Sequence, residues 1–208
     1  MYRLYDHLSS GNGYKVRLLL AQLGVPFERV ELDIMRGETR TADFLARNPN
    51  GRTPTLEIEP GVYLPESNAI LCYLADGSPL LPAERLARAQ VLQWMFFEQY
   101  SHEPNIATVR FWVGHDQLTP EGRALLESRR ALGYAALDVM ERHLAHRPFF
   151  VADRYTIADI ALYAYTHVAG EGGFELDRFA AIDAWLGRVR EQPAHIAITE
   201  EVGAPGRA

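Results

Sequence analysis

The sequence has a single cysteine, a single lysine and no long apolar run. Cys72 is the only cysteine among 208 residues, which excludes an internal disulfide framework, a CxxC redox pair and a zinc site built on several thiolates. No window approaches the roughly 18 consecutive apolar residues of a membrane-spanning helix, and the opening segment carries no apolar signal sequence. We therefore expect a soluble protein of a reducing, cytoplasmic compartment.

An excess of positive charge is also missing. The formal net charge is −6, whereas a nucleic-acid or anionic-membrane partner would favour a cationic face. We expect neither partner. Lys15 is the only lysine among 21 basic residues, so arginine is the default cation of this chain and a single arginine in a promising place carries little weight.

What is present begins with a small α/β pattern. Strand-like runs at 2–7, 27–32, 55–58 and 62–64 alternate with helical patterns at 14–23, 41–47 and 66–74. The first two strands are joined through a helix and should be parallel, while the last two form a hairpin and should be antiparallel. This order, βαβαββα, predicts a small α/β domain with a mixed four-stranded sheet over residues 1–77, an order that resembles the thioredoxin-like fold.

The rest of the chain has a different pattern. After a Pro- and Gly-bearing linker at 78–84, helical patterns cover about 84–113, 121–145, 156–169 and 178–190, and no further strand pattern follows. We expect an all-α helical bundle domain over 85–208. Pro104 interrupts the first long helical pattern and should kink or break it near His102 and Glu103.

The stretch NPNGRTPTLEIEP, residues 48–60, opens the third predicted strand with a proline. Pro54 has no N–H, so it fits only at the first residue of a strand or at an edge, and Thr53 is biased towards extended geometry. A cis Thr53–Pro54 bond would point the backbone of Thr53 outward, free to pair with an extended peptide-like ligand. The alternative is an ordinary trans proline, the commoner form of X–Pro bonds.

Glu66 and Ser67 open the helical pattern at 66–74. A helix N-terminus presents unpaired N–H groups and a partial positive charge, which together bind a carboxylate. The Ser67 hydroxyl can add a donor, and the Glu66 carboxylate can hold an ammonium group. The pair suits the head group of an α-amino acid, although both residues are also ordinary in a first helical turn.

Together these features resemble the cytosolic glutathione transferases. The resemblance rests on the thioredoxin-like order, the Thr53–Pro54 step, Glu66–Ser67, the proline-rich linker and the all-helical second part. SSGNGYKVRLLLAQLG is similar to the serine-type branch (theta-, zeta- or nu-like), and YTIADI is similar to the family's helix cap, with Thr156 at N-cap and Asp159 at N3. EQYSHEPNIATVRFW and GEGGFELDRFAAIDAWLGRV are similar to bacterial members.

The resemblance implies glutathione as cosubstrate, bound along one edge of the first domain. The γ-glutamyl group would lie on Glu66 and Ser67, the cysteinyl backbone would pair with Thr53 beside Pro54, and Arg52 would lie along the same edge. The expected reaction is attack of the glutathione thiol on a small hydrophobic electrophile, a detoxification chemistry. A glutathione-dependent disulfide oxidoreductase, an isomerase and a non-catalytic glutathione-binding or scaffold protein remain alternatives.

The same resemblance assigns thiol activation to Ser10. A free thiol has a pKa near 8.5, and lowering it by about 2 units requires roughly 2.7 kcal/mol of preferential stabilisation of the thiolate. One hydroxyl that donates to a charged sulfur can supply about 1.5–3 kcal/mol of this. Asn12 and Ser9 remain alternatives at the sulfur, as does tyrosine-type catalysis by Tyr5 or Tyr14, and each of the first three is also an ordinary turn residue.

The second substrate would be bound by residues of the first bundle helix. Tyr100, Glu103, Arg110 and Phe111 are candidates to line its pocket, while an ion pair between Glu103 and Arg110 is an alternative use of the two charges. The resemblance implies a homodimer and calls for no metal and no nucleotide.

Two further candidates are weak. His143 and His146 stand three residues apart with no obvious third metal ligand. Cys72 falls among apolar residues and is expected to be a small buried residue rather than a nucleophile.

Overall fold

The structure is a computed structural model that describes residues 1–115 and 119–206. Its contacts divide the chain into two compact units, Met1–Asp76 together with the chain from Pro193 onward, and Gly77–Gln192. The residues from Pro193 onward thus group with the first unit, whereas the sequence pattern places the helical domain over 85–208, and these domain bounds stay a prediction. The physical reason for this grouping is a set of hydrogen bonds from the first helix to this C-terminal segment, described below.

The first unit is built on a mixed sheet with the strand order β4-β3-β1-β2-β5. The strands are β1 (Tyr2–Asp6), β2 (Phe27–Glu31), β3 (Thr55–Glu59), β4 (Val62–Pro65) and β5 (Ala204–Pro205). β1 pairs in parallel with β2 and antiparallel with β3, and β3 and β4 form the hairpin. The predicted thioredoxin-like fold is confirmed, and a fifth strand, β5, adds to the predicted four by pairing in parallel with β2.

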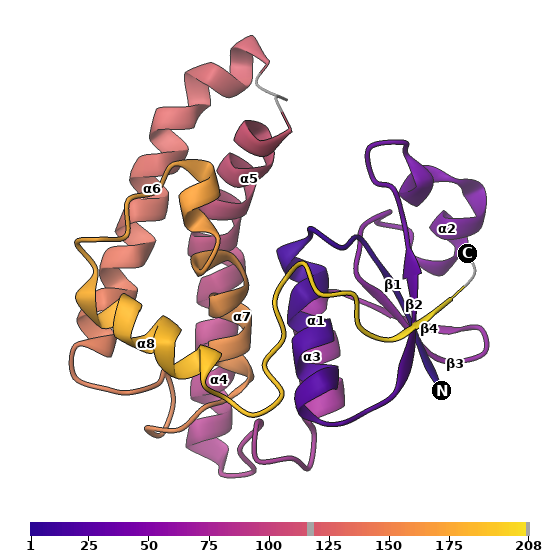
Figure 1. The fold of residues 1–208 in the computed structure, drawn as a ribbon, viewed down its shortest axis with the longest axis horizontal. Coiled ribbons are helices and arrows are strands. Elements are labelled where there is room, and N and C mark those ends of the chain that lie inside the picture. The colour runs from indigo at the N-terminus through magenta and orange to yellow at the C-terminus, as the bar shows by residue number, and fades with distance from the viewer. Residues whose placement is uncertain (116–118, 207–208) are drawn as a thin grey trace. The chain divides into compact units, whose positions relative to one another are not determined.

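Helices cover both faces of this sheet. The helices α1 (Gly11–Gln22) and α3 (Ser67–Ala75) lie side by side on one face, and α2 (Ala42–Arg47) lies on the other, preceded by the short helix η1 (Glu38–Arg40) (Figure 1). The alternation of strand β1 divides the core accordingly. Leu4 packs with Val16 and Ile70 under α1 and α3, and Tyr5 packs with Phe44 of α2.

Buried side chains of α1 hydrogen-bond to the backbone of the C-terminal segment. The Tyr14 hydroxyl donates to the Ile196 carbonyl at 2.7 Å, and the Arg17 guanidinium donates to the carbonyls of Ile198 and Glu200 at 3.1 and 3.2 Å. Arg17 also pairs with Asp6 at 2.8 Å, and both side chains are fully buried. Burial raises the pKa of Asp6 to about 6, although the nearby guanidinium opposes this change. The segment, drawn in yellow in Figure 1, runs along α1 to the sheet.

The second unit is helical, as predicted. Its elements are α4 (Arg85–Phe97), η2 (Glu98–His102), α5 (Glu103–Gly114), α6 (Pro120–Leu144), α7 (Ile157–Thr166), η3 (Ala169–Gly172) and α8 (Ala180–Arg190). The expected interruption near Pro104 is confirmed as the π-helical turn η2. Pro104 has no N–H to offer the carbonyl of Tyr100, so the regular α-helical ladder cannot continue through this point.

The predicted cap of α7 is confirmed. Thr156 accepts a hydrogen bond from the Ala158 N–H, and the Asp159 carboxylate accepts from the backbone N–H of Thr156 at 2.9 Å, which completes a capping box. Asp159 also accepts from the indole of Trp185 and the N–H of Phe150. Because this carboxylate is fully buried, its pKa is raised to about 6.

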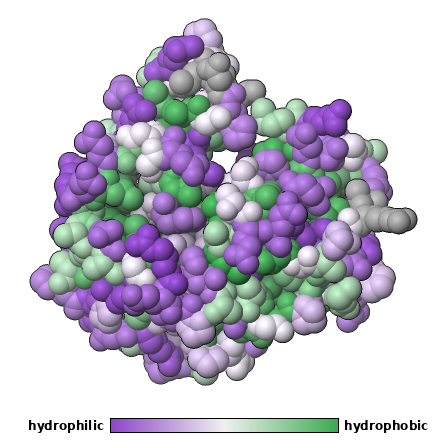
Figure 2. Space-filling model, viewed as in Figure 1, coloured by the Kyte–Doolittle hydropathy of each residue, from purple (hydrophilic) through white to green (hydrophobic). Residues whose placement is uncertain are grey.

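The surface carries mixed polar and apolar residues. Figure 2 shows hydrophilic residues over most of one face, with smaller apolar areas between them. Within residues 1–115 and 119–206, no helix combines the length and the apolarity that crossing a membrane requires.

Candidate functional site

Ser10 begins α1 as its N-cap. Its backbone is extended (φ −71°, ψ 123°), and its Oγ accepts a hydrogen bond from the Gly13 N–H at 3.3 Å. The alternative that this serine caps the helix is therefore confirmed, and it does not conflict with a catalytic role. The cap uses an oxygen lone pair, so the hydroxyl proton still has to be donated to another group.

Asn12 is fixed by two side chains of the first unit. Its Oδ1 lies 2.8 Å from Lys15 Nζ and 3.3 Å from Ser67 Oγ. An ammonium group only donates, so the Asn12 atom that faces Lys15 must be the oxygen. The amide NH₂ of Asn12 is therefore directed away from Lys15 and Ser67.

Asn12, Lys15 and Ser67 form a cluster of contacting side chains, and no role for Lys15 in it was predicted from the sequence. The Lys15 side chain is fully buried, and its Nζ lies within 3.4 Å of Ser67 Oγ as well as contacting Asn12. The sequence does contain a signal for it. A chain that otherwise uses arginine for every basic position places its only lysine one helical turn after Asn12.

The N-terminus of α3 joins the same cluster. Glu66 precedes the helix as its N-cap with φ 72° and ψ 110°, and its side chain is exposed. Ser67, the first residue of α3, is only 5% exposed, and its contact with Asn12 brings the N-termini of α1 and α3 together. Two helix N-termini that meet supply converging N–H donors for an anionic group.

The segment before β3 lies at the same end of the sheet as the N-terminus of α3, because Thr55 pairs with Pro65. The Thr53–Pro54 bond is cis, which is the less common of the two alternatives that the sequence leaves open. Pro54 is buried, Thr53 is half-buried and Arg52 is exposed. The Asn48 side-chain amide donates to the Arg52 carbonyl at 2.8 Å and so fixes the loop.

The hydroxyl groups that are alternatives to Ser10, those of Tyr5, Tyr14 and Ser9, each contact another group of the first unit. The Tyr5 hydroxyl lies 3.2 Å from Glu57 Oε2, and the Tyr14 hydroxyl donates to Ile196. Both tyrosines are buried. Ser9 is exposed, and its Oγ lies 3.0 Å from His7 Nε2. The assignment of thiol activation to Ser10, with Asn12 and Ser9 as alternatives, stays a prediction.

The candidates for the second substrate lie on η2 and α5. Tyr100 is 88% exposed, and Phe111 stacks on His115 with ring centroids 4.6 Å apart. Arg110 forms an ion pair with Glu171 at 2.7 Å, and Glu103 is the first residue of α5. A pocket formed by Tyr100, Glu103, Arg110 and Phe111 stays a prediction.

The weak candidates have structural contacts. The His143 ring stacks on Phe150, and burial lowers the pKa of its imidazole. Among the residues that the structure describes, no group of three or more His, Cys, Asp or Glu side chains is arranged to hold a metal ion. Cys72 is half-buried on α3 rather than fully buried as expected.

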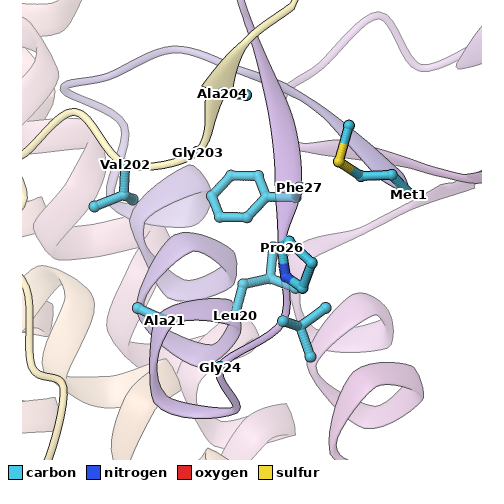
Figure 3. A pocket seen from close by; sticks show the side chains of 10 residues that line it. Met1, Leu20, Ala21, Gly24, Pro26, Phe27, Val202, Gly203 and Ala204 are labelled. Carbon is cyan, nitrogen blue, oxygen red and sulfur yellow. The ribbon is translucent and has the colours of Figure 1, made fainter.

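A cavity of about 370 Å³ opens elsewhere in the first unit. Figure 3 shows Phe27 extending from β2 towards the C-terminal segment that carries Val202 and Gly203, with Leu20 and Pro26 beside it. The lining contains no ionisable side chain and none of the predicted site residues. This cavity therefore carries no chemistry of the candidate site.

Comparisons with known proteins agree with this arrangement. The N-terminal domain model of glutathione S-transferases matches residues 1–76, and the C-terminal domain model matches residues 123–188. A glutathione S-transferase crystal structure from Pseudomonas fluorescens is 53% identical, with a TM-score of 0.93 over 96% of this chain and 99% of that one. A glutathione transferase of Phanerochaete chrysosporium in complex with oxidized glutathione is 28% identical, with a TM-score of 0.81 over 93% of this chain and 92% of that one.

The transcriptional regulator URE2 of Saccharomyces cerevisiae is 31% identical over 94% of this chain and 66% of its own length. The chain thus spans about two thirds of that relative. The two domain matches, the likeness to the Pseudomonas structure and the paired helix N-termini beside a cis-proline lead to one conclusion: the chain belongs to the glutathione S-transferase family.

Proposed function

We propose that this protein is a cytoplasmic glutathione transferase that activates the glutathione thiol for attack on a small hydrophobic electrophile. The single observation that carries the proposal is the 3.3 Å contact between Ser67 Oγ and Asn12 Oδ1. It joins the helix terminus suited to an amino-acid head group with the turn that holds the candidate thiol donors. A tripeptide thiol could bridge these two positions.

The binding mode follows from the groups available. The N–H groups of the first turn of α3 would hold the γ-glutamyl carboxylate, and exposed Glu66 would hold its ammonium group. The Ser67 hydroxyl already contacts Asn12, so we assign it to joining the two helix ends rather than to the carboxylate. The backbone of Thr53 would pair with the cysteinyl residue, and Arg52 would lie near the glycyl end.

The thiol would lie at the N-terminus of α1. The Ser10 hydroxyl proton and the Asn12 amide NH₂ are the donors, and the partial positive charge of the helix end adds about 0.5 kcal/mol. Donation from a hydroxyl to a thiolate contributes about 1.5–3 kcal/mol, which corresponds to about 1–2 pKa units of the thiol.

Titration of the bound thiol tests this assignment. Glutathione is added to the wild-type protein, binding is measured by calorimetry, and the thiolate is followed by its ultraviolet absorbance between pH 5 and 10. We expect a thiol pKa well below the value of the free peptide, and Ser10→Ala should raise it by about 1–2 units. Ser9→Ala is the matched control because it removes a hydroxyl from the same turn.

Two results would contradict the proposal. If the wild-type protein bound no glutathione, the proposed function would be wrong. If Ser10→Ala instead kept the wild-type thiol pKa and full turnover, the assignment of Ser10 would be wrong and Asn12 would be the remaining candidate.

A glutathione-dependent disulfide oxidoreductase is the second candidate within the same site. The complex of the Phanerochaete relative with oxidized glutathione favours it. With no CxxC pair in the chain, glutathione itself would carry the sulfur chemistry. Conjugation of a chlorodinitrobenzene-type electrophile, compared with reduction of a mixed disulfide of glutathione, separates the two reactions.

A non-catalytic role is the third candidate, favoured by the name of the yeast relative, a transcriptional regulator. Fold alone does not decide between an enzyme and a binding protein. Tight binding of glutathione with an unshifted thiol pKa would support this candidate.

We also propose that the protein is a homodimer. In support, Leu92, Phe96 and Tyr100 stand four residues apart on α4 and η2 and are all exposed, Phe96 by 70% and Tyr100 by 88%. Exposed apolar residues that repeat along one helix are typical of an interface.

A further inference from the structure

Lys15 occupies a position that would ordinarily hold an aliphatic residue. It lies in the second turn of α1 between Tyr14 and Val16, and all three side chains are fully buried. Removing an ammonium group from water is costly unless the charge is compensated by polar partners. Among its contacts, the Nζ lies 2.8 Å from Asn12 Oδ1 and 3.4 Å from Ser67 Oγ.

We propose that Lys15 is a positioning residue for the glutathione thiol, acting through Asn12. Its ammonium group holds the Asn12 carbonyl oxygen, so that the amide NH₂ is presented to the sulfur. This inference rests on the proposed function, in which the sulfur lies at the N-terminus of α1.

The contact affects more than the orientation of the amide. A hydrogen bond from a charged donor is shorter and stronger than a neutral one. A cation at the amide oxygen draws electron density from the NH₂ group, so its N–H bonds become better donors, and hydrogen bonds joined in series strengthen one another. Lys15 thereby stabilises the thiolate by orienting and polarising the Asn12 amide.

Ser67 extends the network to the other end of the ligand. Its hydroxyl contacts both Lys15 Nζ and Asn12 Oδ1. The head-group end and the thiol end of the site therefore share one buried cation. A neutral residue at position 15 would loosen Asn12 without removing any atom that we assign to ligand contact.

Other ionisable groups lie near the N-terminus of α1, and they affect the choice of readout. His7 bonds to Glu31 and Ser9, the Asp6–Arg17 pair lies beneath Gly13, and Glu66 is exposed at the start of α3. The reaction rate would depend on these groups as well as on the sulfur. The thiolate absorbance of bound glutathione reports the sulfur alone and is the readout of choice.

The experiment compares six proteins: wild type, Lys15→Met, Lys15→Gln, Asn12→Ala, the Lys15→Met/Asn12→Ala double variant and Arg3→Met. Thermal unfolding first confirms that each is folded. Arg3→Met is the charge control, because it removes one cation from the same unit at a residue paired with Glu28 on the sheet.

We expect Lys15→Met to raise the pKa of the bound thiol by about 1 unit, a tenfold loss of thiolate at acidic pH. Lys15→Gln keeps one neutral donor for Asn12 and should lie between Lys15→Met and wild type. The double variant should match Asn12→Ala, because two residues that act through one contact are not additive. Arg3→Met should leave the thiol pKa unchanged.

A thiol pKa that is the same in Lys15→Met and wild type, while Asn12→Ala shifts it, would overturn the inference and leave the proposed function standing. Absence of glutathione binding by wild-type protein would instead overturn the proposed function. If Lys15→Met does not fold, Lys15→Gln alone decides, and a wild-type thiol pKa in that variant would count against a role for the charge.

Discussion

Gly13 is the residue of the candidate site that leaves least room for change. A Cβ at this position would lie 1.5 Å from Asp6 Oδ1, and the other carboxylate oxygen of Asp6 is held by buried Arg17 at 2.8 Å. We expect Gly13→Ala to lower the free energy of unfolding by about 3 kcal/mol, measured by urea titration.

Gly187→Ala is the matched control for this prediction. Gly187 is also helical, in α8, and a Cβ there would meet nothing within 4 Å. Because alanine is the better helix former, this variant should gain about 0.5–1 kcal/mol. Equal stability of Gly13→Ala and wild type would show that the carboxylate beneath α1 can move aside.

Asp159 gives stability a specific pH dependence. Its pKa is raised to about 6 by burial, whereas an unfolded aspartate titrates near 4. A raised acid pKa stabilises the fold fully below the unfolded value, and this contribution is lost as pH rises through the folded one. The stability advantage of wild type over Asp159→Asn should therefore shrink by about 3 kcal/mol between pH 4 and 7.

Urea unfolding of both proteins at each pH checks this prediction. The difference between them isolates Asp159 from the other carboxylates, which titrate equally in both. A gap that widens with pH would mean that the hydrogen bonds from Trp185, Thr156 and Phe150 outweigh burial and hold the carboxylate ionised.

Some of these residue roles could be predicted from sequence, and others could not. Thr156 and Asp159 follow a local rule at fixed spacing, so their capping box was predictable. The contact of Lys15 with Ser67 was not, because Ser67 is 52 residues away in the chain. A contact of that kind leaves no periodic signal and shows only as an unusual residue type.

Arg17 of α1 bonds to three other parts of the first unit: strand β1, the turn after it and the C-terminal segment. It bonds to Asp6 of β1, to the Leu8 carbonyl at 2.6 Å, and to the carbonyls of Ile198 and Glu200. Leu8 begins the turn that leads to Ser10. The C-terminal segment therefore supports the turn that carries the candidate thiol donors.

We expect Arg17→Met to lower the free energy of unfolding by about 3–5 kcal/mol, because it leaves a buried carboxylate without its cation. Adding Asp6→Asn should recover part of this loss. Thermal unfolding measures both effects, and amide exchange should show residues 196–206 losing protection. If the single variant and wild type unfold together, the pair does not hold the segment.

Periodicity predicted the long helices and the four strands β1 to β4 but missed β5. The helices from α4 to α8 carry enough turns for an apolar pattern to show, and Pro104 marked η2 in advance. β5 is only two residues long and exists through pairing with β2, which lies far away in the sequence. The conformation of β5 therefore depends on tertiary contacts rather than on a local sequence pattern.

The division into two units was readable from the change of period near residue 77. The identity of a second substrate could not be predicted from the sequence. Its pocket would depend on how side chains from different elements are arranged together, and no local sequence pattern encodes that arrangement. The resemblance in the sequence therefore reached the family, and the cosubstrate and the second substrate stay proposals.

The proposed homodimer predicts a clear effect at Phe96, which is 70% exposed on α4. Phe96→Asp would place a charge in an apolar contact and should convert the dimer to a monomer at micromolar concentration, as seen by analytical ultracentrifugation. Leu132→Asp, on a 55% exposed residue of α6, is the matched control and should stay dimeric. A wild-type protein that sediments only as a monomer would rule out the interface.

Because the C-terminal segment bonds to α1, the first unit can complete its hydrogen bonds only late in translation. Residues 77–192 must leave the ribosome before the carbonyls of Ile198 and Glu200 can reach Arg17. At translation rates of about 5–20 residues per second, this delay is roughly 6–23 s. A nascent chain stalled before Pro193 would therefore hold its first unit with Arg17 incompletely bonded, open to chaperones and proteases until the last strand arrives.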